Sequence, residues 1–371
     1  MRKILLTTSA LAGVAMVAGT AMAEAPKVTF SGSTDYYVRM TDYDTPTGGT
    51  EPQNGPGWDI NQHAPASELI WDANATADNG LQFGANIQLR YAGTASTDEA
   101  WVDFAGSWGR VVLGDDDGVI DNNQIAGHSV LPIGAYDTGR FTGAIATPAG
   151  WTSSFSTPTG GPAEASEDSS KIAYYSPSFA GFSVAVSATP DTGSTFGATN
   201  TASVGSYQNA VEATVNYKGD FSGVGVGLFG GYATGKASSS NGVSREDLDA
   251  FELGGSVSVA GFAVAVGYSD GGESGLVSNA GGDAGKALTA GVAYNFGAGK
   301  VGVGYASTWD AKTTAASREM EAEYYSVEGS YTIAQGLTGY GGVMFATRDN
   351  NATTASEADS TIFVLGTRVN F

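Results

Sequence analysis

The strongest constraint on the fold is a two-residue alternation of side-chain polarity that recurs along most of the chain. Between residues 28 and 40, Val28, Phe30, Val38 and other mostly apolar residues occupy one set of alternate positions, and Asp35 and Arg39 belong to the other. The segment that starts at position 81 repeats this pattern. Successive side chains of a β-strand point to opposite faces, so each segment predicts a strand with one apolar and one polar face. The apolar face could meet either a soluble protein core or lipid.

Sixteen segments of the chain are predicted strands. They are 28–40, 67–78, 81–93, 98–107, 110–116, 169–176, 181–189, 208–217, 223–234, 247–258, 262–270, 285–296, 300–309, 319–333, 337–348 and 359–371. A strand of ten residues, rising ~3.3 Å per residue and tilted about 45°, spans roughly 23 Å, close to the ~25 Å apolar band of an outer-membrane barrel. The segment lengths therefore suit strands that cross a membrane.

The connections between these strands alternate in length. Tight turns follow the even-numbered strands, at 78–80, 108–109, 178–180, 218–220, 260–261, 297–299 and 335–336. Longer segments follow the odd-numbered strands, at 41–66, 117–168, 190–207, 235–246, 271–284, 310–318 and 349–358, and only 94–97 is short. A rim of tight turns and a rim of long loops is typical of an up-and-down membrane barrel, whereas a Greek-key sandwich does not sort its loops this way.

These patterns predict an all-β fold, a 16-stranded antiparallel transmembrane barrel of the up-and-down type. An even strand number of about sixteen leaves an aqueous channel, whereas about eight strands enclose only their own side chains. The last strand ends on Phe371, preceded at alternate positions by Val369 and Leu365. We expect this strand to pair with the first one and so to close the barrel, because no backbone group can stay unpaired in lipid.

The N-terminus carries the features of a secretory signal peptide. Arg2 and Lys3 precede a short apolar run, and an A-x-A cleavage site ends at Ala23. The run is too short for a membrane-spanning helix, although an N-terminal anchor is the alternative interpretation. We predict a signal peptide at 1–23, with cleavage after Ala23, and a barrel at 24–371.

Composition excludes several functional classes. The net charge of −21 argues against nucleic acid as a partner, because phosphate binding needs a basic surface. The absence of Cys excludes disulfides and the metal and redox motifs that use thiolates. Gly is abundant, at 54 residues, and Tyr and Phe contribute 17 and 16. A Gly-rich, aromatic, acidic and exported chain favours a β-architecture with polar residues inside.

Two stretches carry a resemblance to a known family. The stretch 100–114 reads AWVDFAGSWGRVVLG, and 172–182 reads IAYYSPSFAGF. Together with the strand pattern and Phe371, they resemble the trimeric general-diffusion porins of Gram-negative bacteria, nearest the alphaproteobacterial branch. One departure is Asp115, where many members carry a basic residue after the Leu-Gly pair. The resemblance implies a homotrimer in the cell outer membrane, in contact with outer-membrane lipid and lipopolysaccharide, that passes small hydrophilic solutes and ions.

The resemblance also implies that the long third loop, 117–168, folds into the barrel and narrows it. The loop is far longer than an ordinary connection, so it is either functional or disordered. Its first half contains apolar residues such as Ile120, Leu131, Tyr136 and Phe141, which favours packing. Its second half consists mainly of Gly, Pro, Ser, Thr and Glu. An external cap and a mobile loop are the alternatives.

The densest cluster of charge lies where this loop begins. Asp115, Asp116, Asp117 and Asp121 are interpreted as the acidic side of the pore constriction, together with Asp137. Asp116, Asp117 and Asp121 are also a candidate Ca²⁺ site, because Ca²⁺ prefers oxygen ligands, although no EF-hand spacing is present. The alternative is a solvated start of the loop without a metal.

Two arginines on polar strand faces are candidates for the basic side of the constriction. The resemblance implies that Arg39 and Arg90 face the acidic loop, and such opposed charges would orient polar solutes in a transverse field. The alternative is that each arginine pairs with a neighbouring acid. Arg110 and Arg368 are expected to lie too near the short-turn rim to join them.

Two further motifs do not support an enzyme. Residues 225–230 read GVGLFG and match the dinucleotide pattern G-x-G-x-x-G, but no helix is predicted after them. The only histidines, His63 and His128, both lie in predicted loops, so no three-His metal site can form and a Ser-His pair is not expected. No catalytic and no cofactor-binding residue is assigned.

The function predicted from the sequence is passive diffusion of small hydrophilic solutes through a water-filled pore. The acidic charge predicts a weak preference for cations. The alternatives are a substrate-specific channel, for which no aromatic path or convergent polar site is evident, and a structural or adhesive surface barrel without an open pore.

Overall fold

The computed structural model describes residues 25–371 apart from 46–47, 53–54, 93–95, 150, 152–160, 195–205, 239–242, 279–281, 314–317 and 352–356. The predicted signal peptide, 1–23, lies outside the described residues. No helix among the described residues is long and apolar enough to cross a membrane.

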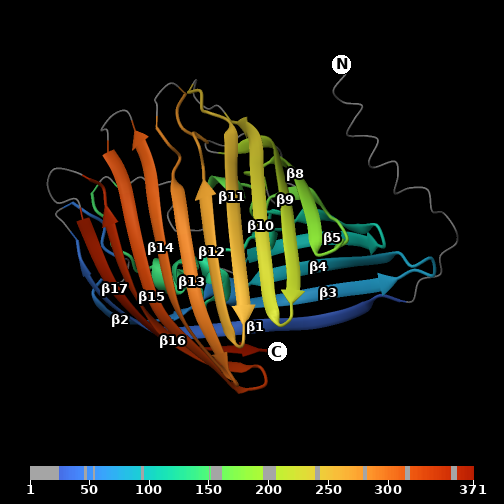
Figure 1. The fold of residues 1–371 in the computed structure, drawn as a ribbon, viewed down its shortest axis with the longest axis horizontal. Coiled ribbons are helices and arrows are strands. Elements are labelled where there is room, and N and C mark those ends of the chain that lie inside the picture. Colours follow the sequence, from blue (N-terminus) through green and yellow to red (C-terminus); the bar gives the residue numbers. More distant parts are fainter. Residues whose placement is uncertain are drawn as a thin grey trace.

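One antiparallel sheet contains all the strands. They are β1 (Lys27–Asp44), β2 (Gly57–Gln62), β3 (Glu68–Thr76), β4 (Gln82–Arg90), β5 (Ser96–Gly106), β6 (Gly109–Asp115), β7 (Ser170–Tyr175), β8 (Phe182–Asp191), β9 (Tyr207–Phe221), β10 (Val224–Ala237), β11 (Leu248–Val259), β12 (Phe262–Asp270), β13 (Lys286–Phe296), β14 (Gly299–Thr313), β15 (Arg318–Ala334), β16 (Leu337–Asp349) and β17 (Glu357–Asn370). β1 pairs with β2, β3 and β17, and from β3 onward each strand pairs with the next, so the sheet closes into a barrel (Figure 1).

The closure lies where the sequence predicts it. Ser33 is opposite Asn370, and Gly32 and Phe371 exchange two backbone hydrogen bonds of 2.9 Å. The terminal residue therefore leaves no open edge at the seam between β1 and β17, as a barrel in lipid requires.

The first loop contains a strand that the sequence pattern does not reveal. β2 pairs with residues 36–41 of β1, whereas β3 pairs with residues 27–33, so the two short strands share one position beside β1. The short helix η1 (Ala64–Ala66) separates them and contains Pro65, which has no backbone N–H for a ladder. The seventeen strands thus form a closed 16-stranded barrel, and the predicted loop 41–66 is corrected to a loop plus β2.

Most predicted tight turns are confirmed, and one is misplaced. The turn predicted at 218–220 lies within β9, and the chain reverses instead at Ser222 and Gly223, with φ of 58° and 87°. Gly219 lies within the strand, and the absence of a side chain there leaves room for the ring of Tyr217, which a Cβ would meet. In the sequence alone, a glycine that makes room for a neighbouring ring, such as Gly219, cannot be distinguished from a glycine that forms a turn.

The apolar strand faces point outward, away from the barrel interior. Val28, Phe30 and Met40 are 66%, 54% and 54% exposed, whereas Asp35 on the other face of β1 is fully buried. Near the short-turn rim, aromatic rings from neighbouring strands pair on the outer surface, as in Phe182 with Tyr217 at a centroid distance of 4.8 Å. An apolar exterior with aromatic residues at its edge is the surface that a lipid bilayer requires.

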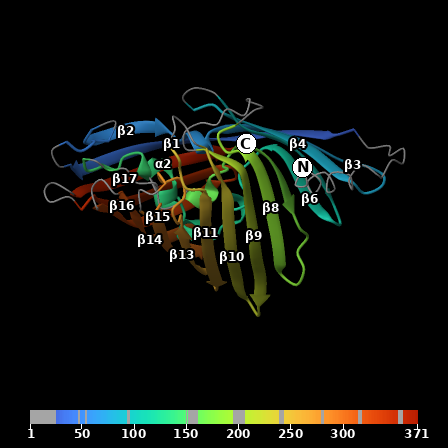
Figure 2. The ribbon, with the colours of Figure 1, turned by 90° about the horizontal axis from the view of Figure 1, so that it is seen from above.

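The described part of the third loop, which comprises residues 116–149, 151 and 161–169 between β6 and β7, lies inside the barrel (Figures 1 and 2). Its short helices are η2 (Asp121–Asn123), η3 (Gly127–Val130), η4 (Ala135–Asp137), α2 (Gly139–Thr142) and η5 (Pro162–Glu164). η3 contacts β12 to β14, and α2 contacts β17. The backbone N–H of Gly127 donates to Thr289 Oγ1, and that of Ala146 donates to Ser360 Oγ, both at 2.9 Å. The predicted folding of this loop into the lumen is confirmed.

Apolar side chains and glycines explain why the loop follows the wall. Tyr136 and Phe141 are fully buried in a cluster with residues of the inner faces of β14 to β17. On the same inner surface, a Cβ at Gly254 would overlap the backbone of Ile125. The wall therefore lacks side chains where the loop backbone needs to approach it closely.

We expect Gly254→Ala to destabilise the docked third loop and Gly255→Ala to leave it unchanged. An added methyl at Gly254 meets the loop backbone, and overpacking of this kind costs about 1–3 kcal/mol. Gly255 is adjacent on β11, and a Cβ there makes only ordinary contacts, the nearest at 3.6 Å from Leu228. Thermal unfolding and protease cleavage within the third loop would measure the difference, and equal behaviour of the two variants would show that wall contact does not hold the loop.

Candidate pore constriction

A buried ionic cluster ties the third loop to the barrel. Arg140 of α2 donates to Asp35 Oδ2 of β1 at 2.7 Å, and Arg368 of β17 donates to the same oxygen at 3.0 Å. Tyr340 of β16 donates its hydroxyl to the other oxygen of Asp35, and Arg140 lies over the Tyr340 ring at 5.1 Å from its centroid. Removing one partner of such a buried pair leaves an uncompensated charge, so the cluster holds the loop in one position.

Three carboxylates meet at another part of the lumen wall. Glu99 of β5 and Asp117 and Asp168 of the third loop place carboxylate oxygens within 4.8 Å of one another, and we call this group the carboxylate triad. Burial, together with the nearby charges of Asp121, Glu99 and Asp168, raises the pKa of Asp117 to about 9. Burial also raises the pKa of Asp121. Asp117 therefore keeps its proton at neutral pH.

A cavity of about 550 Å³ opens beside the triad, and we call it the acidic cavity. It is lined by Gln88, Glu99, Trp101, Arg110, Asp116, Asp117, Asn122, Asn123 and Tyr175. These residues come from β4, β5, β6, β7 and the start of the third loop. The wall combines carboxylates, amides and two aromatic rings on the side of the barrel from which the loop departs.

Arg110 is the basic residue of this cavity. It donates to Asp103 Oδ2 at 2.9 Å, and its guanidinium lies 4.7 Å from the ring centroid of Trp101 and 5.9 Å from that of Tyr175. Arg110 and Arg368 lie beside short turns, as expected, but their side chains reach the acidic cavity and Asp35. Arg110 carries the positive charge next to the acids at the start of the loop.

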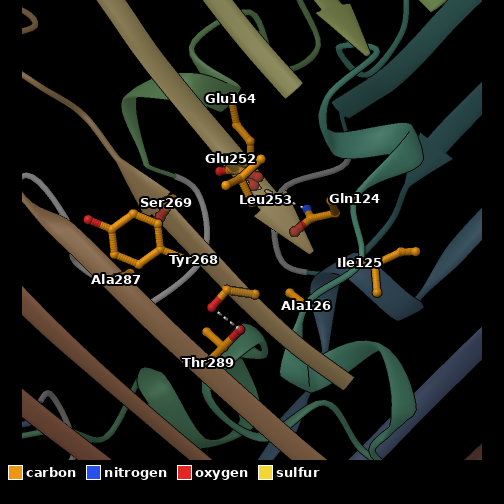
Figure 3. Close-up of a pocket in the computed structure, with 11 residues that line it drawn as sticks. Gln124, Ile125, Ala126, Glu164, Glu252, Leu253, Tyr268, Ser269, Ala287 and Thr289 are labelled. Carbon is orange, nitrogen blue, oxygen red and sulfur yellow. Dashed lines mark hydrogen bonds between the residues drawn. The ribbon is translucent and has the colours of Figure 1, made fainter. Parts of the chain in front are cut away.

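The returning arm of the third loop brings another buried acid to the wall. Glu164 of η5 points toward Glu252 of β11, and Gln124 lies beside them (Figure 3). Gln124 Nε2 donates to Glu164 Oε1 at 3.1 Å and to Asp121 Oδ1 at 2.7 Å. Burial raises the pKa of Glu164 well above its ordinary value, and the charge of Glu252 adds to the shift. A protonated Glu164 can donate a hydrogen bond where two ionised carboxylates would repel each other.

The residues predicted for the acidic side do not all line one cavity. Asp116 and Asp117 line the acidic cavity, and Asp121 begins η2 beside Gln124. Asp115 lies in register with Ala100, on the same face of β6 as the exposed Leu113, and accepts a hydrogen bond from Ser170. Its side chain therefore points away from the lumen, which corrects the expectation for this residue.

Asp137 and the two predicted basic residues have partners of their own. Asp137 Oδ2 lies 3.5 Å from His128 Nε2. Arg39 pairs with Asp59 of β2 at 2.9 Å, and its Nη1 also donates to the backbone oxygen of Arg140 at 3.4 Å.

Arg90 pairs with Glu68 at 3.1 Å and with Asp98 at 2.5 Å. Both candidate arginines of the basic wall thus pair with neighbouring acids, which is the alternative that the sequence left open. Their part in a transverse field stays a prediction.

The predicted metal ligands do not form one group. Among the described residues, the acids with metal-ligand spacing are Glu99, Asp117 and Asp168, so Asp117 is the single member shared with the predicted Ca²⁺ set of Asp116, Asp117 and Asp121. The sequence missed Glu99 and Asp168 because they lie far from Asp117 along the chain. Glu99 does occupy a polar-face position of its predicted strand, but that position alone does not tell which loop residues will approach it.

The buried acids make the stability of the third loop depend on pH. An unfolded aspartate releases its proton near pH 4, whereas Asp117 holds its proton up to a pKa of about 9. Folding therefore binds a proton between these values, and stability falls as the pH rises. We expect the unfolding midpoint of the wild type to fall from pH 6 to pH 9, and Asp117→Asn to reduce this slope. A slope that is unchanged in the variant would contradict the burial of Asp117.

Comparison with known proteins supports the same architecture. The structure resembles an anion-selective porin from Comamonas acidovorans, with a TM-score of 0.65, 17% identity, and coverage of 93% of this chain and 100% of the other. It also resembles OmpT, an outer membrane protein of Vibrio cholerae in its trimer form, with a TM-score of 0.64, 15% identity, and coverage of 94% and 100%. A mutant porin of Rh. blastica matches with a TM-score of 0.58, 17% identity, and coverage of 93% and 100%. At these identities the likeness shows the fold.

No curated protein sequence matches the chain significantly. The sequence profile of the Gram-negative porin family, in contrast, matches residues 7–351, which is most of the chain. The closed 16-stranded barrel, the apolar exterior and the loop folded into the lumen agree with this match. The chain belongs to the Gram-negative porin family and is a diffusion channel of the outer membrane.

Proposed function

We propose that this porin passes small hydrophilic solutes and ions passively and prefers cations weakly. The observation that supports this preference is the composition of the acidic cavity, whose wall includes Glu99, Asp116 and Asp117. Arg110 is the one basic residue of that wall, and its charge is already paired with Asp103. A channel wall with more acidic than basic side chains lowers the energy of a passing cation relative to an anion, even with Asp117 protonated.

The barrel itself does not decide this preference. The similar structure from Comamonas acidovorans is named an anion-selective porin, although its fold matches this one over 93% of the chain. Selectivity therefore depends on the side chains that line the lumen and on how the third loop places them.

We also propose that the protein has no catalytic role. Both histidines contact residues of the third loop. His63 Nε2 lies 3.2 Å from Thr138 Oγ1, and His128 Nε2 lies 3.5 Å from Asp137 Oδ2. Burial lowers the pKa of His63 to about 3, so its ring stays neutral and serves as a hydrogen-bond partner of the loop.

Neutralising two of the three acids of the cavity should reduce cation preference. In planar bilayers with a KCl gradient, we expect a reversal potential of cation-selective sign for the wild type and a smaller one for Glu99→Gln/Asp116→Asn. Asp115→Asn is the matched control, because it removes the neighbouring charge on the outward face of β6. Anion selectivity of the wild type, or equal shifts in both variants, would refute the proposed preference.

A homotrimer in contact with outer-membrane lipid and lipopolysaccharide is the assembly we propose. The similar Vibrio cholerae protein is described in a trimer form, and the exposed aromatic and aliphatic residues on the strands here supply an apolar exterior. Native mass spectrometry of the detergent-solubilised protein should give three times the monomer mass, and a monomer at all concentrations would contradict this assembly.

A further inference from the structure

Two buried carboxyl groups, those of Glu164 and Glu252, meet where the third loop returns to the sheet. We call residues 161–169 the returning arm. Each of the two side chains is 7% exposed. The other charges that act on them most strongly are all acidic, and they are Asp121, Asp137, Glu167 and Glu212. Two carboxylates that share one buried position do not both ionise, because neither water nor a cation screens their repulsion.

The hydrogen bonds around the pair also require a proton. Glu164 and Glu252 are hydrogen-bonded to each other, and two carboxylate oxygens offer no donor for such a bond. Gln124 Nε2 donates to Glu164 Oε1 at 3.1 Å and to Asp121 Oδ1 at 2.7 Å, which uses both of its N–H groups. The donor between the two glutamates is therefore a proton on one of their own carboxyl groups.

The pair lies where the returning arm packs on the barrel wall, which Figure 3 shows. η5 contacts β10, β11 and β12, and Ala163 beside the pair is buried in an apolar cluster with residues of β9 to β11. The cavity next to the pair measures about 20 Å³, and one buried water needs roughly 10–15 Å³. Space for a single water cannot hydrate a second charge, so a second ionisation requires the arm to leave the wall.

The neighbouring strands supply no cation to the pair. On the described inner faces of β10, β11 and β12, Glu252 is the one titratable side chain. Tyr207 of β9 belongs to the apolar cluster, and Tyr268 borders the cavity but directs its hydroxyl to Asp270 at 3.2 Å. Loss of the shared proton therefore leaves two negative charges with no partner of opposite sign.

We propose that Glu164 and Glu252 form a pH-sensitive latch, which holds the returning arm on the wall while the pair shares one proton and releases the arm when that proton passes to water. The arm also carries Asp168, whose carboxylate lies within 4.8 Å of those of Glu99 and Asp117. Release takes Asp168 away from these residues and widens the lumen beside the acidic cavity. The latch goes beyond the proposed cation preference and does not depend on it.

The direction of the pH effect follows from where the proton is bound. Burial raises the pKa of Glu164 well above its ordinary value, and the charge of Glu252 adds to the shift. A glutamate in a hydrated, released arm loses its proton at about pH 4. The docked arm therefore holds one proton more than the released arm. Between these two values, each pH unit raises the ratio of released to docked arm about tenfold.

Reactivity of a single cysteine measures the released arm. The chain contains no cysteine, so Ala163→Cys supplies one thiol, at a buried position next to Glu164. The refolded barrel reacts with iodoacetamide in detergent micelles between pH 6 and pH 9, and each rate is divided by that of N-acetylcysteine to remove the ionisation of the thiol. We expect this rate ratio to rise about tenfold per pH unit until the arm is fully released, the slope for loss of one proton.

Glu164→Gln should abolish this slope in the same cysteine background. Glutamine keeps the size of the side chain and donates an amide N–H to Glu252 in place of the proton, so the arm stays docked at every pH. Glu252→Gln supplies the donor from the strand side and should behave alike, which keeps the test available if one variant does not fold. Asp117→Asn is the matched control, because it removes another carboxyl group of the third loop outside the latch, and it should retain the slope.

Single-channel conductance gives the functional readout. In planar bilayers with symmetric KCl, we expect the ratio of wild-type to Glu164→Gln conductance to rise between pH 6 and pH 9, and taking this ratio removes the ionisation of other lumen carboxyl groups. The latch is overturned by a flat rate ratio in the wild type, by equal slopes with and without Glu164→Gln, or by a slope that only Asp117→Asn removes. A constant conductance ratio would overturn the widening of the lumen. Reversal potentials test the cation preference separately, so the two proposals can fail independently.

Discussion

The structure depends on one constraint: a backbone N–H or C=O in lipid has no water to bond to, and leaving it unpaired costs several kcal/mol. A sheet can meet this requirement only by closing on itself. Here β17 returns to β1, and Phe371 and Gly32 complete the ladder at the seam. A closed barrel in lipid also reverses the usual arrangement of a soluble protein, with apolar side chains outside and polar side chains inside. Because the outer face meets lipid, the polar half of every alternating strand must face the interior, and charges such as that of Asp35 accumulate there.

Those interior charges determine how the third loop narrows the lumen. On one part of the wall Asp35 binds Arg140, and apolar residues and glycines allow the loop backbone to approach closely. On the part formed by β4 to β7 the loop has just left the sheet, and the acidic cavity remains open beside Glu99 and Asp117. The loop both narrows the lumen and supplies half of the charged groups that line the acidic cavity, so the proposed cation preference depends on the position of the loop.

Much of the fold could be predicted from the sequence, and the errors have identifiable physical causes. The strand faces, most turns and the closure at Phe371 were correct because alternation and turn chemistry are local properties. The turn predicted at 218–220 was wrong because Gly219 makes room for the ring of Tyr217 within a strand. The prediction that Asp115 lines the pore was wrong. Asp115 is the last residue of β6, whereas Asp116 and Asp117 belong to the loop, so the three side chains do not share a face. The sequence placed Arg110 near the short-turn rim but missed its contact with the acidic cavity, because the position of a residue in a strand does not show how far its side chain extends.

The sequence by itself determined an acidic, antiparallel barrel with a long third loop, since two-residue periodicity and connection length are properties of the chain alone. Only the tertiary structure decided which charges meet. Arg140 reaches Asp35 across more than a hundred positions, and Glu99, Asp117 and Asp168 converge from a strand and the two ends of one loop. Such contacts depend on how deeply the loop folds into the barrel and where it follows the wall. Many weak packing contacts between the loop and the barrel wall determine that path, and the polarity pattern of the sequence does not show them.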